Sequence, residues 1–510
     1  MPFAGRKGGV GALDRAVAGD RDARHRELVG GEIGGVVPVV QQVDLCAAGV
    51  SDATEALDGI DGLVSGASVL SDFKLNEVVS TVTTGPNLGR LTFYTVMNKG
   101  VYDGLSDEAR AALDEIKGEP ISKMTEEAWV ATADKAAVLT DWTRRLRTGA
   151  AVDHATAFVM AVQENKYYVD TAGTSTTQQR VRMQPGFEAM GTGADTFDSM
   201  ASIAPPVGRG WEYVAGGAAQ GAWDWDAEID EVPELLAEKL KAPSVEPGPY
   251  DLVIHPSNLW LTIHESIGHA TELDRALGYE ANYAGTSFAT YDKLGTLQYG
   301  SPVMNVTGDR TVEHGLATVG YDDEGVETQS WDIVRDGVLV GYQLDRPMGA
   351  MKPELAGPEH PQGRSNGCAY ADSPGHIPIQ RMANVSLQPA PDGPSTEELI
   401  GRVERGLYVV GDKSWSIDMQ RFNFQFTGQR FYAIRDGELT GQVRDVAYQA
   451  TTTDFWGSME AVGGPGTWVL GGAFNCGKAQ PGQVAAVSHG CPTALFRGVN
   501  ILNTTQEGGQ

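Results

Sequence analysis

Cysteine is scarce in this chain, with four residues in 510, which excludes a disulfide framework as its main source of stability. Long apolar runs are also missing, because nowhere do about 18 consecutive apolar residues occur, the length that a membrane-spanning helix needs. Residues 1–20 lack the apolar segment of a secretory signal. We therefore expect a cytoplasmic protein that does not span a membrane.

Positive charge is in short supply as well. Lys and Arg together number 39 against 67 Asp and Glu, so the net charge is −28. A field of this sign repels phosphate backbones and anionic lipids. We therefore expect neither nucleic acid nor a membrane among the partners. The 41% hydrophobic and 21% charged residues are typical of a globular protein, and the length suggests two to four domains.

The turn signals favour a mixed α+β fold with much antiparallel sheet in the C-terminal part. Asp-Gly pairs separate β-prone runs in residues 331–342 and 431–440, which predicts two hairpins with type I′ turns. Residues 250–255 are expected to form a strand, and residues 91–96 another. Ser395 and Glu398 have the spacing of a capping box, opening a helix that Gly406 could end. Residues 1–51 show no clear pattern and stay unassigned.

One segment carries the chemistry. Residues 256–278 have the start and stop signals of a helix, and His264, Glu265 and His269 lie within it. Five residues turn a regular helix by roughly 500°, which would leave the two imidazoles about 140° apart and unable to share a metal ion. A π-bulge would bring them together, and Gly268 offers the backbone freedom for it. The alternative is that both histidines are ordinary polar residues of a half-exposed helix.

A metal held by two histidines needs a third ligand from elsewhere in the chain. Cys476 lies among glycines that allow close backbone approach, and the nearby Lys478 would help to lower the pKa of its thiol. His489 and Cys491 are rivals, since they offer two ligand types two residues apart. Composition alone does not choose among the candidates, which are Cys476, His489, Cys491, His314 and Cys368.

Several blocks in this order resemble the TldD/PmbA family of metallopeptidases. The similarity extends from about residue 136 to residue 503, and it is strongest in the segment His264-Glu-Ser-Ile-Gly-His269. It is closest to the TldD-type partner, because the PmbA-type partner lacks the His-Glu pair. The other blocks that carry it are residues 321–326, 337–342, 381–384, Tyr408, 424–426, 476–478 and 482–483.

The resemblance implies a zinc endopeptidase that cleaves unfolded or extended peptides. Zinc would be held by His264, His269 and Cys476, and Glu265 would activate the zinc-bound water. The family's equivalent of residues 487–493 carries no metal ligand, which speaks against His489 and Cys491. The family also implies pairing with a PmbA/TldE-like partner chain or a second copy, and it bears the older label of modulator of DNA gyrase.

The resemblance also implies a domain division. Residues 136–245 correspond to the middle region of a TldD-type chain, and residues 246–510 to its C-terminal catalytic domain. Residues 52–135 are different, because about 52–129 resemble a fragment of the solute receptors of TRAP transporters. The residues that carry this second similarity are Glu55, Asp61-Gly62, 72–78, 96–99 and 102–106.

Two readings compete with the peptidase. The first is a non-catalytic subunit that supports or regulates a peptidase complex, as PmbA-type chains do. The intact set of His264, Glu265, His269 and Cys476 disfavours it. The second is solute binding by residues 52–129, which are too few to build both lobes of a receptor cleft.

Overall fold

The computed structural model describes residues 62–66, 82–83, 93–97 and 132–507, with gaps at 171–172, 195, 218, 220, 357 and 479–481. The chain divides into two compact units, one of residues 1–84 and 94–119, and the other of residues 85–93 and 120–510. Three short strands near the N-terminus form a sheet in the order β1-β3-β2. They are β1 (Gly62–Gly66), β2 (Val82–Thr83) and β3 (Phe93–Met97). The strand expected at residues 91–96 is therefore confirmed as β3. Apart from these three strands, the TRAP-like segment of residues 52–129 lies outside the described residues.

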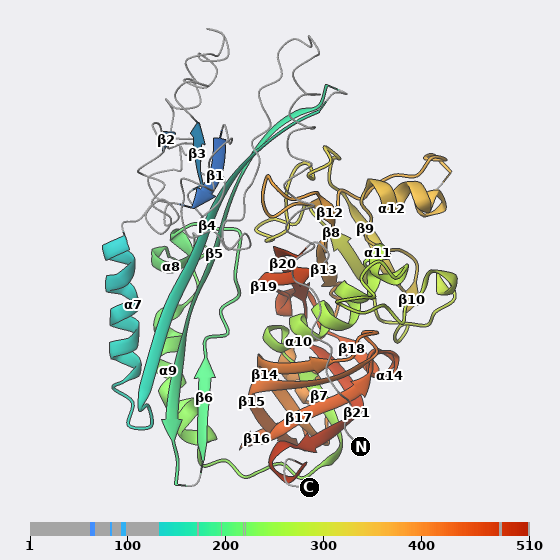
Figure 1. Ribbon diagram of the computed structural model, residues 1–510. Coiled ribbons are helices and arrows are strands. Elements are labelled where there is room, and N and C mark those ends of the chain that lie inside the picture. The colour runs from blue at the N-terminus through green and yellow to red at the C-terminus, as the bar shows by residue number, and fades with distance from the viewer. Residues whose placement is uncertain are drawn as a thin grey trace, which may run out of the picture. The chain divides into compact units, whose positions relative to one another are not determined.

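Residues 132–239 form an antiparallel sheet in the order β4-β5-β6, covered by two helices. The hairpin of β4 and β5 is long, and it runs upward past the helices in Figure 1. Trp142 of α7 stacks on Trp225 of α9 with ring centroids 4.5 Å apart, beside Phe187 of β5. The elements are α7 (Thr132–Leu146), β4 (His154–Val169), β5 (Ser175–Thr192), β6 (Phe197–Ala201), α8 (Glu212–Ala215) and α9 (Trp225–Lys239).

Several of the C-terminal strands form one sheet that closes on itself. Its order is β14-β7-β21-β17-β15, and β14 pairs again with β15 to complete the ring. Only β7 and β14 are parallel neighbours, and the other pairs in the ring are antiparallel. The mixed helix and sheet architecture is thus confirmed. The strands, with β16 and β18 attached to the ring, are β7 (Gly248–Ile254), β14 (Arg405–Ile417), β15 (Asn423–Arg435), β16 (Glu438–Val443), β17 (Val446–Thr451), β18 (Met459–Val462) and β21 (Ala494–Asn503).

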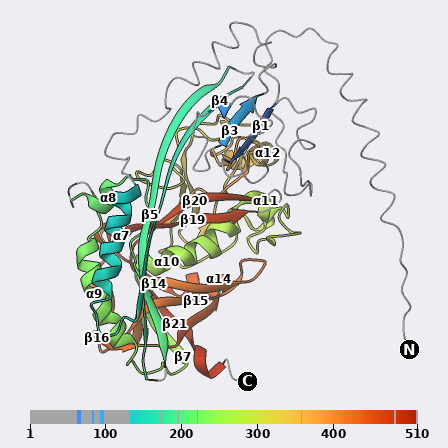
Figure 2. The same ribbon diagram turned by 60° about the vertical axis from the view of Figure 1, so that its left-hand side comes forward.

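Smaller sheets lie on the other side of the central helix α10 (Pro256–Ile263), away from the closed sheet (Figures 1 and 2). One has the order β10-β9-β8-β13, and two are hairpins, β11-β12 and β19-β20. Their strands are β8 (Val306–Asp309), β9 (Ser330–Arg335), β10 (Val338–Leu339), β11 (Ala369–Tyr370), β12 (Ile379–Gln380), β13 (Asn384–Leu387), β19 (Val469–Lys478) and β20 (Gln483–Cys491). Four further helices are α12 (Arg346–Met351), α13 (Thr396–Ile400), α14 (Thr452–Gly457) and α15 (Thr504–Glu507).

The Asp-Gly turns form as expected, at the ends of β9-β10 and β15-β16. Both residues of each pair have positive φ, 49° and 79° in the first turn and 49° and 83° in the second, as a type I′ turn requires. The capping box of Ser395 and Glu398 is also present.

The predicted end of that helix is wrong, because α13 stops at Ile400 and Gly406 lies in β14. A Cβ at Gly406 would lie 2.3 Å from the carbonyl oxygen of Asp251 on β7. Glycine is therefore needed there for the close approach of two strands.

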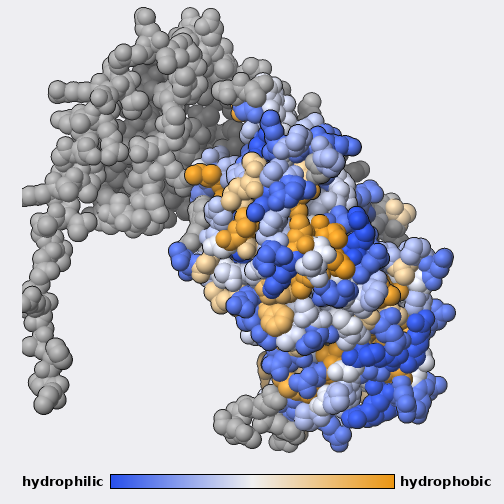
Figure 3. All heavy atoms as spheres, turned by 90° about the vertical axis from the view of Figure 1, so that its right-hand side faces the viewer, coloured by the Kyte–Doolittle hydropathy of each residue, from blue (hydrophilic) through white to orange (hydrophobic). Residues whose placement is uncertain are grey.

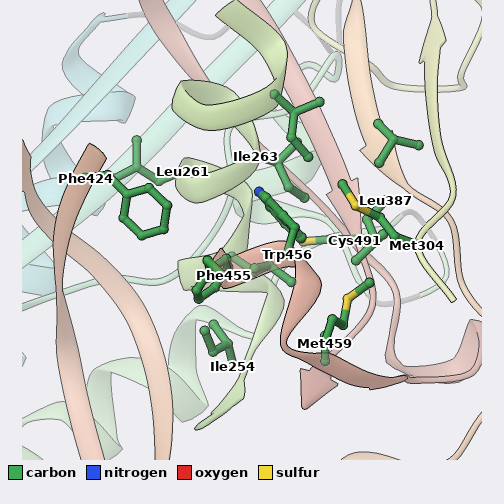
Figure 4. Packing of buried hydrophobic residues seen from close by; sticks show 14 of the residues in the cluster. Ile254, Leu261, Ile263, Met304, Leu387, Phe424, Phe455, Trp456, Met459 and Cys491 are labelled. Atoms are coloured by element: carbon green, nitrogen blue, oxygen red, sulfur yellow. The ribbon is translucent and has the colours of Figure 1, made fainter. Parts of the chain in front are cut away.

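Helix α10 is buried on nearly every side, between the closed sheet and the β19-β20 hairpin. Figure 4 shows Leu261 and Ile263 of this helix among apolar residues of the surrounding strands and α14. Burial of the polar Asn258 is compensated, because its amide donates to two strand carbonyls and its oxygen accepts from the Tyr448 hydroxyl. The core thus fixes the helix on which the candidate site lies.

The surface seen in Figure 3 mixes hydrophilic residues with patches of hydrophobic ones. Within the described residues, no helix has both the length and the apolar character needed to cross a membrane.

Candidate metal centre

The helix containing the two histidines changes its winding where they occur. After α10, residues His264–Gly268 form a π-helical turn, in which the His269 N–H donates to the His264 carbonyl five residues earlier. A short 3₁₀ turn and α11 (Leu273–Ala276) follow, and Gly278, with φ 90°, ends the helical segment as expected. The π-turn that the five-residue spacing predicted is therefore present.

The part played by Gly268 differs from the prediction, because its φ of −52° is open to any residue. A Cβ there would lie 2.6 Å from the sulfur of Met382, so the flexible end of the methionine side chain would have to move to admit a larger residue.

The π-turn brings the predicted residues together. The donor atoms of His264, His269 and Cys476 all lie within 4.8 Å of one another, and all three side chains are buried. The Cys476 sulfur of β19 is 3.7 Å from Nε2 of His269. The two imidazoles meet edge to face, with centroids 4.7 Å apart. Among the described residues this is the one group whose spacing suits a metal ion.

His264 is oriented by a second histidine. Nδ1 of His489 lies 2.8 Å from the Val385 carbonyl oxygen and must donate to it. Because burial lowers the pKa of His489 far below its usual range, that ring is neutral and its Nε2 can only accept. Nε2 of His489 is 2.7 Å from Nδ1 of His264, so Nδ1 of His264 carries the proton. The Nε2 lone pair of His264 is thereby left for a ligand.

His269 is oriented by a carboxylate. Its Nδ1 lies 3.0 Å from Oε2 of Glu272, which is fully buried with Arg275 and Lys478. Burial alone would raise the pKa of Glu272, but Lys478 and the other cations around it hold that pKa well below its usual range. An ionised Glu272 must accept the Nδ1 proton, so Nε2 of His269 is also free. A carboxylate or carbonyl behind a ligating histidine is the usual arrangement in metal sites.

The expected influence of Lys478 on the cysteine is wrong. The Lys478 ammonium is 2.8 Å from Asp274 and 3.3 Å from Glu272, and it is engaged there. Burial raises the pKa of the Cys476 thiol, but His269 and Arg381 outweigh this effect and hold it below its usual value. Arg381 also donates to the Cys476 carbonyl. Lys478 is close to Cys476 in the sequence, but its ion pairs with Asp274 and Glu272 keep it from lowering the pKa of the thiol.

Glu265 lines the same cavity as the three donors and pairs with an arginine. Its Oε2 is 2.9 Å from Nη1 of Arg421, in the loop between β14 and β15. Burial alone would raise the pKa of Glu265, but the neighbouring histidines and Arg421 hold it below its usual range. Arg421 has a φ of 62°, a strained value for a non-glycine residue. Both side chains line a cavity of about 510 Å³ that also contains His264, His269 and Cys476.

The other candidates do not join the group. The Cys491 thiol is buried against the Pro256 carbonyl, and burial raises its pKa. His314 contacts the Gly208 carbonyl instead, and Cys368 is buried elsewhere. His489 lies behind His264. Its role could not be read from the sequence, because 225 residues separate the two rings. The contact of Glu272 with His269 could have been inferred from the sequence, since Glu272 follows His269 by three residues in the same helical segment.

Comparison with known proteins places these observations in a family. Residues 247–503 match the model of the PmbA/TldA metallopeptidase C-terminal domain, which is half of the chain. The chain belongs to the PmbA/TldA metallopeptidase family. The matched range contains every residue of the candidate centre, and it begins with the strand that leads into α10.

Two relatives of this PmbA/TldA chain carry peptidase names. It is 31% identical to a metalloprotease of Methanocaldococcus jannaschii over 44% of this chain and 45% of the relative. It is 25% identical to the zinc metalloprotease TldD homolog of Saccharolobus solfataricus over 53% and 55%. The chain thus spans about half the length of the curated relatives it matches. These matches lend no support to the TRAP-receptor fragment.

Solved structures agree on the fold of the PmbA/TldA chain. A protein from Thermotoga maritima described as a modulator of a DNA gyrase superposes with a TM-score of 0.56 at 14% identity, over 78% of this chain and 83% of the other. TldE from Thermococcus kodakarensis gives 0.55 at 15% identity, over 80% and 86%.

Proposed function

We propose that this protein is a zinc-dependent endopeptidase that cleaves unfolded or extended peptides. His264, His269 and Cys476 would hold the zinc ion, and Glu265 would be the catalytic base. The names of the relatives support a metallopeptidase, and one of them names zinc. The observation that carries the proposal is the convergence of two imidazole nitrogens and one sulfur within 4.8 Å.

The donor set suits zinc. Two imidazoles and a thiolate are ligands that zinc prefers, and three protein ligands leave a position open, as in catalytic zinc sites. Both rings already have Nδ1 occupied, by His489 and Glu272, so each presents its Nε2. A bound zinc ion would supply Lewis-acid chemistry that polarises a peptide carbonyl and lowers the pKa of water.

The proton transfers fall to Glu265. Its carboxylate is ionised, is adjacent to His264 in the chain and faces the cavity. It can accept a proton from the attacking water and deliver it to the leaving amine. Arg421 compensates the buried charge of Glu265 and holds the carboxylate in one orientation. The cavity wall is completed by β4, β5 and β19, which exclude bulk water from one side.

We further propose the division of the chain that the sequence suggested. Residues 246–510 would be the catalytic domain and residues 136–245 the middle region of a TldD-type chain. A TldE-like chain or a second copy would be its partner, in keeping with the fold shared with TldE. A supporting subunit without activity is the alternative, and the intact donor set disfavours it.

Metal analysis of paired cysteine variants tests this proposal. The purified full chain should contain one zinc per chain, and Cys476→Ser should weaken zinc binding strongly, because the thiolate is lost. Cys491→Ser is the matched control and should keep its zinc, since Cys491 lies outside the donor group. Cleavage of an unstructured, internally quenched peptide is measured on the same samples. A metal-free wild type, or zinc loss in Cys491→Ser alone, would refute the assignment.

A further inference from the structure

One carboxylate in the cavity of the candidate centre forms no ion pair with any residue that the structure describes. Asp412 of β14 lines the same cavity as His264 and Glu265. Its Oδ1 accepts a hydrogen bond of 3.1 Å from Nε1 of Trp260, which is one helical turn before His264. Within the described part of the chain, no lysine, arginine or histidine forms an ion pair with it. The adjacent Lys413 is turned away to Asp198, 2.5 Å from its carboxylate.

Asp412 differs in this respect from the carboxylates beside the metal donors. Glu265 and Glu272 each have a cation beside them. Asp322 has no such partner, but it accepts hydrogen bonds from three backbone amides. Asp412 accepts from the Trp260 indole and from its own backbone amide, and burial raises the pKa of its carboxyl to about 6. Above that pH the fold keeps an uncompensated negative charge at the cavity wall, which costs free energy without a ligand.

Several aromatic side chains line the cavity that contains Asp412. Trp260 lies beside it, and Phe158, Trp223 and Trp415 line the same cavity. Phe158 of β4 and Trp415 of β14 remain about half exposed, at 49% and 53%, so their faces are accessible to a ligand. Aromatic faces attract ammonium and guanidinium groups. Arg421 also lines this cavity, but it is paired with Glu265 and not with Asp412.

We propose that Asp412 and the aromatic side chains around it form a subsite for a cationic group of the peptide substrate, next to the bond that is cleaved. The proposal rests on the proposed function and specifies its substrate class. Lys or Arg side chains have this chemistry, and so does the free amino terminus of a peptide. A carboxylate with an aromatic surround recognises all three by an ion pair and cation–π contacts.

The position beside the cleaved bond follows from Trp260. This indole donates to Asp412 and lies edge to face with His264, at a centroid distance of 6.3 Å. Asp412 and the candidate metal ligand His264 therefore both lie next to Trp260. A lysine or arginine one residue from the reacting carbonyl has the length to cover this separation.

Paired peptides test the subsite on the zinc-loaded full chain. One series of internally quenched peptides carries Lys, Arg, norleucine or Glu at each position near the cleaved bond, with an acetylated amino terminus. A second series has a free amino terminus and norleucine. We expect kcat/KM for the Lys or Arg peptide at one position to exceed that for norleucine by about 10-fold or more, as for a desolvated charge pair. A preference confined to the second series would identify the terminus as the cationic group.

Asp412→Asn is the decisive variant, because it keeps the shape and removes the charge. The ratio of Lys to norleucine peptides should fall to about 1, whereas Asp436→Asn, the same change in a remote exposed turn, should preserve it. A wild type without preference for cations, or an Asp412→Asn variant that retains it, overturns the subsite.

Failure of the proposed function gives a different result, in which zinc-loaded wild type cleaves none of the peptides. Calorimetric binding of the uncleaved Lys and norleucine peptides then decides the subsite separately, with equal affinities as the refuting outcome.

Discussion

The two imidazoles of the candidate centre are held in the same tautomer by opposite means. Behind His264 lies a neutral relay, in which His489 accepts from the ring and donates to the Val385 carbonyl. Behind His269 lies the charged Glu272, enclosed by Arg275 and Lys478. The relay can only orient its ring, whereas the carboxylate also makes its ring a stronger base. Orientation and charge are thus supplied from different sides of one small site.

The two ways of orienting His264 and His269 matter only if the centre cleaves peptides. Glu265→Gln tests this premise, and it is the variant for which we expect the largest effect. The amide keeps the size of the side chain but cannot accept the proton, so peptide cleavage should slow by roughly 10²–10⁴-fold. Zinc content, measured on the same sample, should be unchanged because Glu265 is outside the donor group. Full activity would remove Glu265 from the mechanism.

Glu272→Gln should break the charged side. The amide oxygen can still accept from His269, but Arg275 and Lys478 lose a buried partner. Loss of one member of a buried ion pair costs about 3–5 kcal/mol, so urea unfolding should show a large loss of stability along with weaker zinc binding. Asp436→Asn is the exposed control. Unchanged stability would mean that Asp274 alone can compensate both cations.

His489→Phe should break the neutral side with a smaller effect on stability, because no charge is left unpaired. Loss of a partner behind a ligating histidine lowers metal affinity by about 10–100-fold. His489→Gln offers an acceptor oxygen near the former Nε2 and should recover part of this loss. Zinc affinities by chelator competition decide the point, and equal values for both variants would deny His489 an orienting role.

Asp412→Asn tests the carboxylate that accepts from Trp260 and forms no ion pair with any described residue, and its effect on stability is the smallest. The folded pKa of about 6 lies above the ordinary 3.8, so between these values the folded state binds more protons than the unfolded state. The free energy of unfolding therefore falls as pH rises through this window. The variant should be more stable than wild type by roughly 1–3 kcal/mol at pH 7.5 and equal to it near pH 4. Urea unfolding at both pH values measures this, and a less stable variant at pH 7.5 would contradict it.

Local chemistry explains what could be predicted from the sequence. The Asp-Gly turns, the capping box at Ser395 and the π-turn between the histidines each depend on a few neighbouring residues. The grouping of His264 and His269 with Cys476 was implied by the family resemblance, because local geometry left five candidates open.

Long-range contacts account for what the sequence concealed. His489 reaches His264 across 225 residues, and Lys478 is diverted from Cys476 by carboxylates more than 200 residues away. The glycine at position 406 gave a misleading helix-stop signal, because its purpose is the approach of β7 to β14. Such partners are set by how distant strands and helices pack against each other, which no local sequence pattern shows.

The π-turn makes the extra residue between the histidines a local feature of the helical segment. On a regular helix one added residue would rotate everything beyond it by about 100° and shift it by about 1.5 Å. The wider turn absorbs this offset, so Glu272 and Arg275, which lie beyond it, keep their places in the buried charge cluster. We therefore expect that deletion of Ser266 would be accommodated by rewinding the turn as α-helix, with the residues on both sides kept in register.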